Sequence, residues 1–120
     1  MESRAANPVV IGGDVHMCVV ADLKTDFDDP QAPVVATEFV GTSITSQGLS
    51  QKQLDGWRAD NPHIHFGNSS HRGYTTIELT PRRCTARMRA LSNVADPMSG
   101  IRTLAAFTVE DGRPGAQRGS

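Results

Sequence analysis

Residues 7–16 have the sequence NPVVIGGDVH, and this stretch decides the fold. Its apolar part is β-branched and shows no alternation with polar residues. Such a run is typical of a strand that is buried on both faces in the centre of a layered sheet. The two glycines remove side chains where a substrate group or another backbone comes close. We therefore expect residues 9–16 to form a buried strand whose end carries Asp14 and His16.

Asp14 and His16 are candidate metal ligands. Because side chains alternate along a strand, the two would point to the same side, with their Cα atoms about 6.5 Å apart. Metal ions in a two-metal site lie about 3.5–4 Å apart, so the pair could bind one metal or one metal each. A carboxylate neutralises metal charge, and a neutral imidazole suits iron or zinc. The spacing also allows another interpretation, in which the aspartate caps a helix and the histidine is an ordinary hydrogen-bonded side chain.

The rest of the chain is dominated by strand signals. Residues 34–40 are an apolar strand candidate that ends at a glycine, and alternation predicts further strands at residues 74–80, 84–90 and 101–109. The fold class that we expect is α/β and β-rich. A chain that opens with a central strand needs neighbours on both sides, so the pattern indicates the end of a larger fold.

One short helix is expected at residues 51–60. Ser50 and Gln53 have the spacing of a capping box, in which each residue satisfies a backbone amide of the other. Leu54 and Trp57 are three residues apart and would share the apolar side. We expect one domain over residues 1–112, followed by a disordered tail at residues 113–120.

Composition excludes several classes of protein. The 120 residues carry a formal net charge of −1, which argues against a nucleic-acid binder with a basic face. No apolar run approaches the roughly 20 residues of a membrane span, and the first residues contain no secretory signal. The two cysteines form no C-x-x-C pair, so a cysteine-based zinc site is not expected.

Several stretches along the chain, in order, carry a family resemblance. They are NPVVIGGDVH at residues 7–16, ADLKTDFDDP at 21–30, VVATEFVGTSI at 34–44, NPHI at 61–64, RGY at 72–74, RTLAAF at 102–107 and EDGRPG at 110–115. Together they resemble the carboxy-terminal part of PhoD-like alkaline phosphatases, members of the calcineurin-like metallophosphoesterase superfamily. The resemblance covers nearly the whole chain, and the ordered set is more specific than any one element.

The resemblance implies a four-layer α/β/β/α metallophosphatase sandwich, of which this chain is the carboxy-terminal portion. It implies hydrolysis of phosphate monoesters and diesters with iron and calcium ions, and it assigns Asp14 and His16 to the element that contributes metal ligands. The family's other ligands lie upstream, and none of them can be located in these residues. The partners implied are a phosphate ester substrate and the missing amino-terminal part of the domain. Family members are commonly exported.

Two further histidines and one arginine are candidate site residues, and each also has an ordinary structural interpretation. His63, in the Asn-Pro-His element, is expected near the rim of the site, as a substrate-binding residue. His65 shares a strand face with it, and the two histidines could complete a four-ligand site with Asp14 and His16, although nothing brings these segments together. Arg72 could contact a phosphate oxygen through its planar guanidinium, or it could be a surface ion-pair partner.

The acidic cluster at residues 26–29 favours a solvated turn, since it lacks the glycine and closing glutamate of a calcium loop.

Two functions follow. In the first, the chain is part of a metal-dependent phosphoesterase. In the second, it is a non-catalytic fragment or a β-rich interaction module with an incomplete metal site. The absence of upstream ligand motifs predicts that the chain alone lacks a complete active site.

Overall fold

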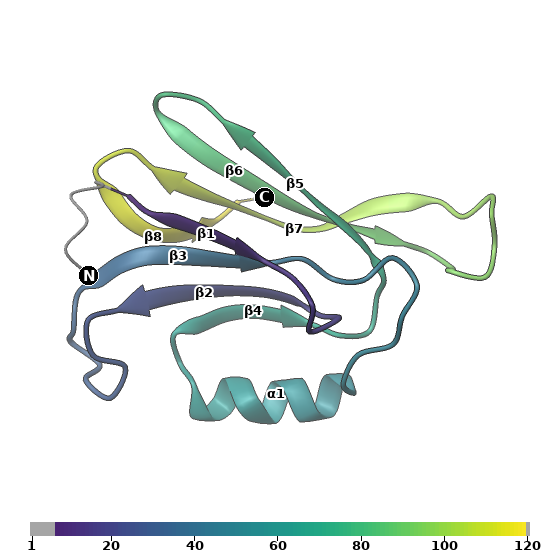
Figure 1. Cartoon of the computed structure of the whole chain (residues 1–120), viewed down its shortest axis with the longest axis horizontal. Coiled ribbons are helices and arrows are strands. Elements are labelled where there is room, and N and C mark those ends of the chain that lie inside the picture. Colours follow the sequence, from purple (N-terminus) through teal and green to yellow (C-terminus); the bar gives the residue numbers. More distant parts are fainter. Residues whose placement is uncertain (1–6, 120) are drawn as a thin grey trace.

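The computed structural model describes residues 7–119, which form two four-stranded sheets and one helix (Figure 1). In the first sheet the strand order is β1-β3-β2-β4. β1 runs parallel to β3, and the other pairs are antiparallel. Its strands are β1 Val9–Gly12, β2 Cys18–Lys24, β3 Val34–Val40 and β4 Ile64–Asn68.

The second sheet is an antiparallel meander in chain order. Its strands are β5 Gly73–Leu79, β6 Arg83–Leu91, β7 Ile101–Glu110 and β8 Arg113–Arg118. The expected strands at residues 34–40, 84–90 and 101–109 are confirmed by β3, β6 and β7.

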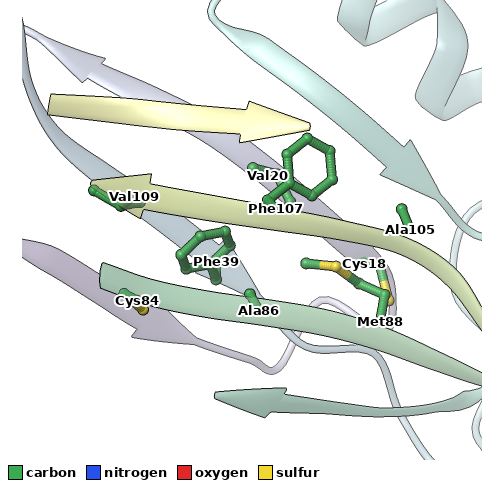
Figure 2. Packing of buried hydrophobic residues seen from close by; sticks show 9 residues of the cluster. All are labelled: Cys18, Val20, Phe39, Cys84, Ala86, Met88, Ala105, Phe107 and Val109. Atoms are coloured by element: carbon green, nitrogen blue, oxygen red, sulfur yellow. The ribbon is translucent and has the colours of Figure 1, made fainter. Parts of the chain in front are cut away.

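The core lies between the two sheets, as the close-up in Figure 2 shows. On β6, residues that alternate along the strand point into it, as the sequence pattern predicts. Burying a phenylalanine contributes about 1.5–3 kcal/mol, so the two buried phenylalanines are major anchors. The buried side chains of this cluster are Cys18, Val20, Phe39, Cys84, Ala86, Met88, Ala105, Phe107 and Val109.

The expected helix is present as α1, Gln51–Asp60, and it packs against β4. The capping box is confirmed, because the Ser50 hydroxyl accepts from the Gln53 amide while the Gln53 side chain accepts from the Ser50 amide. Leu54 is only 1% exposed, as expected, but Trp57 is 53% exposed. The expectation of an apolar side shared by these two residues is wrong, since one buried leucine anchors this helix.

The expectation of a buried central strand at residues 9–16 is wrong for the described part of the chain. The strand ends at Gly12, and β1 is the edge of its sheet, paired only with β3. Val10 and Ile11 are 43% and 65% exposed. The apolar residues of this segment suit burial on both faces. Burial also needs a second neighbouring strand, and the described residues do not provide one beside β1.

The disordered tail predicted for residues 113–120 is also wrong for residues 113–118, while Ser120 lies outside the described residues. Arg113–Arg118 forms β8, which pairs with β7 and packs near β3. The guanidinium of Arg118 lies over the rings of Phe66 and Phe107, 5.3 and 5.8 Å from their centroids. Proline and glycine at residues 114–115 conceal this strand in the sequence, since both are usually depleted in strands.

The strand β2 was not predicted, because its apolar start leads into the acidic segment that follows. That segment is an exposed turn, as expected: the amide of Asp28 donates to the Asp26 carboxylate at 2.9 Å. No helix of the described residues is long and apolar enough to cross a membrane.

Candidate metal half-site

Asp14 and His16 lie in the bend that connects β1 to β2, rather than on a strand. Both have left-handed backbone conformations, with φ of 78° and 61°. This region costs a non-glycine residue about 1–2 kcal/mol, and such conformations persist only where the surroundings hold them. The expectation that the two side chains follow strand alternation is therefore wrong, and the bend determines their directions.

The ring of His16 is oriented by a backbone carbonyl. Its Nδ1 atom lies 2.9 Å from the carbonyl oxygen of Gln47. A carbonyl oxygen can only accept, so Nδ1 carries the proton in this hydrogen bond. In the neutral ring Nε2 then carries the free lone pair, which is the form that binds metal ions. Hydrogen bonding of the second ring nitrogen is the usual way in which proteins orient metal-binding histidines.

The backbone of His16 is held by Arg72. One guanidinium nitrogen, Nη1, donates to the carbonyl oxygen of His16 at 2.7 Å. The same nitrogen donates to the carbonyl of Ser46 at 2.7 Å and to the hydroxyl of Ser43 at 3.1 Å, while Nη2 donates to the carbonyl of Ser69. Arg72 is only 4% exposed and forms no ion pair among residues 7–119. The predicted surface ion pair is therefore wrong.

The end of the bend is anchored in the core, whereas its candidate ligand residues are accessible to solvent. Met17 and Cys18 follow His16 directly and are buried, whereas Asp14 is exposed and His16 is half-buried. Burial raises the pKa of the Cys18 thiol, and a hydrogen bond with the Thr42 backbone and the charge of Arg72 partly oppose this. Both residues therefore have access to solvent, in a bend that is anchored to the core.

His63 and His65 lie at the other end of β2. The amide of Asp22 donates to the carbonyl of His63 at 2.8 Å, and Nε2 of His65 lies 2.6 Å from the Asp22 carboxylate. Asp22 is four residues along the strand from Cys18, which corresponds to about 13 Å. The structure therefore does not bring these histidines to Asp14 and His16. The ring of His63 packs instead against Phe27, with centroids 4.7 Å apart.

A complete metal site is absent from the described residues, in which no three His, Cys, Asp or Glu side chains gather closely enough to hold an ion. The four-ligand alternative is wrong for this reason. What remains is a pair of donors whose chemistry, one carboxylate and one neutral imidazole, fits half of the shell of an iron or zinc ion. We call Asp14 and His16 the half-site.

Sequence reasoning missed the supports of the half-site. The Gln47 carbonyl and the acceptors of Arg72 are mostly backbone oxygens, which carry no sequence signal. Gly48 is the exception: a Cβ atom there would lie 2.4 Å from the carbonyl oxygen of His16. Its requirement for glycine marks the close approach of the two backbones.

Comparisons with known proteins point to one family. A family model described as PhoD-like phosphatase matches residues 1–88. Alkaline phosphatase D of Bacillus subtilis (strain 168) is 36% identical over 115 residues, which are 93% of this chain and 20% of that protein. A solved structure described as the structure of PhoD matches with a TM-score of 0.82 and 36% identity, and the match covers 93% of this chain and 22% of that one. The chain thus spans about a fifth of the curated relative.

Proposed function

Because the chain belongs to the PhoD-like phosphatase family, we propose that it supplies the half-site of a metal-dependent phosphoester hydrolase. Asp14 and His16 would each donate one atom to the metal centre. The remaining ligands would come from the amino-terminal part of a PhoD-like domain. The metals proposed are iron and calcium, and the substrates are phosphate esters.

The observation that supports this most strongly is the hydrogen bond from Nδ1 of His16 to the Gln47 carbonyl. It leaves Nε2 free, two residues along the chain from the exposed Asp14, in a bend whose backbone is fixed from the protein interior. An unconstrained neutral histidine exchanges between its two tautomers in water, and nothing holds it in the Nδ1–H form. A prearranged nitrogen donor in the same bend as a solvent-exposed carboxylate suits a metal ion that carries positive charge.

In such a centre, metal ions polarise the phosphoryl oxygen and lower the pKa of an attacking water. The residues of this chain have simpler tasks. The carboxylate of Asp14 reduces the net charge of the site, and His16 presents a neutral nitrogen at a fixed position. Substrate contacts by His63 and Arg72 stay predictions. Neither gains support from the geometry, since His63 lies at the far end of β2 and the guanidinium of Arg72 donates to protein atoms.

The free edge of β1 offers a place for the amino-terminal part of the domain. A parallel strand is normally covered on both faces, yet Val10 and Ile11 of β1 are exposed. Between β1, β3 and β5 lies a largely apolar cleft of about 290 Å³, lined among others by Ile11, Ile44 and Tyr74. The PhoD structure contains more than four times as much chain as the matched part. We propose that additional strands and helices seat here and complete the four-layer α/β/β/α sandwich.

The second candidate function is a non-catalytic β-rich interaction module. The same free edge and the lack of a third ligand in residues 7–119 favour it. The two candidates differ in one property that the chain shows by itself. A half-site retains a weak affinity for metal ions, and an interaction module has no reason to keep one.

Calorimetric titration of the full chain with Zn²⁺ tests this, because zinc binds neutral imidazole and carboxylate without redox chemistry. We expect weak binding that falls about tenfold or more in His16→Ala and in Asp14→Ala, since the loss of even a partner that orients a ligand costs at least this much. His63→Ala is the matched control and should keep the wild-type affinity. Equal affinities in all four proteins, or no binding to the wild type, would contradict the half-site.

A further inference from the structure

Arg72 is a charged residue buried without an acidic partner among the described residues. Arginine is rarely buried to this extent unless its charge is paired. The hydrogen-bond acceptors of its guanidinium come from three segments: the bend that contains His16, the loop at residues 41–48, and Ser69 at the end of β4. The buried guanidinium of Arg72 therefore connects three segments that the strand pairing of the two sheets does not join.

We propose that Arg72 is a positioning residue for His16, and that it fixes which ring nitrogen His16 presents to a ligand. A consequence of this role for catalysis rests on the proposed function, whereas the hydrogen bonds that position His16 are independent of it.

The link runs through a single nitrogen atom. Nη1 of Arg72 donates to the carbonyl of His16 and to the carbonyl of Ser46, both at 2.7 Å. The residue after Ser46 is Gln47, whose carbonyl accepts from Nδ1 of His16. Arg72 therefore holds the backbone of His16 and also the loop segment whose next residue orients the His16 ring. The backbone and the ring of His16 are both positioned relative to one guanidinium.

Arg72 is itself anchored to the second sheet. The amide of Leu91, at the end of β6, donates to the carbonyl of Arg72 at 2.8 Å. The next residue, Gly73, donates its amide to the carbonyl of Ser43 at 3.0 Å. A Cβ atom on Gly73 would lie 1.9 Å from the Arg89 carbonyl, so β5 and β6 approach too closely for any side chain at that position. Through Arg72, the bend that follows β1 is thus connected to the paired strands β5 and β6.

Lysine cannot reproduce this arrangement. Its ammonium is a single point on a flexible stem, whereas guanidinium has five donors in a rigid fork. Arg72→Lys keeps the buried charge but loses the ability to donate to three segments in fixed directions. A role limited to general stability would lower the melting temperature in this variant and leave the ring of folded His16 unchanged. A positioning role changes the ring even where the fold persists.

The test is the side-chain ¹⁵N spectrum of His16 in the metal-free full chain, at a pH about two units above the ordinary histidine pKa of roughly 6.5. The wild type should show the Nδ1–H form in excess. In Arg72→Lys the ratio of Nδ1–H to Nε2–H should fall about fivefold, the factor expected for the loss of one neutral hydrogen bond. Arg82→Lys, in an exposed turn, is the matched control and should keep the wild-type ratio.

Gly48→Ala provides a second, independent change. It keeps Arg72 but forces apart the two backbones that Arg72 connects, since the new Cβ would lie 2.4 Å from the His16 carbonyl oxygen. The tautomer ratio should fall in the same direction. A wild-type ratio in either folded variant would overturn the positioning role. The tautomer ratio is measured without metal. A chain that fails to bind Zn²⁺ would therefore contradict the proposed function, while the tautomer ratio would still test the role of Arg72.

Discussion

At His16, the backbone and the ring are held by different partners, and both partners lie far away in sequence. Arg72 is 56 residues from His16, and Gln47 is 31 residues from it. The sequence could indicate Asp14 and His16 as candidate ligands, since their residue types and spacing suit metal ions. It could not indicate the left-handed bend or the supports, because the acceptors, apart from the Ser43 hydroxyl, are backbone carbonyls that every residue possesses.

The buried charge of Arg72 shows the same limit. In the sequence, an arginine before Gly-Tyr suggests an exposed phosphate contact or an ion pair, because free guanidinium groups usually face solvent. The interior position follows from the meeting of two sheets and three loop segments, which is a property of the tertiary fold. A residue type predicts which bonds are available, and the fold decides where they are used.

The two buried cysteines predict a pH dependence of stability. Burial raises the pKa of both thiols above the ordinary value of 9.0. Above that pH the unfolded chain releases thiol protons that the folded chain retains, so the free energy of unfolding is unaffected at lower pH and falls as pH rises through the raised values. Urea unfolding at pH 7.5 and at pH 10 measures this fall.

Cys18→Ala/Cys84→Ala is the matched variant for this measurement. It lacks both thiols, so its unfolding midpoint should fall less between the two pH values, whereas lysine and tyrosine contribute equally to both proteins. An identical fall in the two proteins would mean that the thiols are accessible in the folded chain.

At the scale of elements, local signals succeed where the element completes its own hydrogen bonds. Helix α1 was predicted with its bounds and its capping box, because Ser50 and Gln53 carry that information within four residues. The buried face of β6 was predicted from strict alternation. The strand β8 was missed because its place depends on pairing with β7, and its own residues, Pro114 and Gly115 among them, suggest a turn.

Gly115 provides a test of whether β8 is integral to the sandwich. Its φ is +103°, and a Cβ there would lie 3.4 Å from Oδ1 of Asp22. Gly112, in the preceding turn, has φ of +75° with nothing within 4 Å of a Cβ. We expect Gly115→Ala to lower the free energy of unfolding by about 2–3 kcal/mol, because its φ lies far from the left-handed helical region near +57° that L-residues tolerate best. Gly112→Ala, whose φ is closer to that region, should cost about 1 kcal/mol.

Urea denaturation of both variants gives the comparison. Equal losses of stability in Gly115→Ala and Gly112→Ala would show that β8 is held loosely against β2 and β3, and that the cation–π contacts of Arg118 do not order it.

At the scale of the whole molecule, the described residues form a sandwich with one side that lacks cover. β1 and β5 are both edge strands (Figure 1). The apolar cleft described above is lined by residues of both. Unpaired edges that carry apolar residues tend to pair with another chain. The described residues therefore have a well-packed interior between the sheets and an unpaired apolar edge that further protein could cover.

This edge predicts concentration-dependent self-association of the isolated chain. Ile11→Lys places a charge on the exposed edge strand and should lower the association constant by about tenfold or more, because charged side chains oppose edge-to-edge pairing. Met98→Lys, at an 88% exposed position in the loop between β6 and β7, is the matched control. Sedimentation velocity over a range of concentrations measures the effect. A wild-type chain that stays monomeric at every concentration would contradict this interpretation of β1.

The most direct test of the half-site is the hydrolysis of a chromogenic phosphomonoester by the purified chain supplied with iron and calcium. Two ligands without the remaining shell should not assemble a working centre, so we expect the wild type to be no faster than Asp14→Ala. Hydrolysis by the wild type that is lost in Asp14→Ala would contradict the central claim, because it would show that these residues build a complete active site.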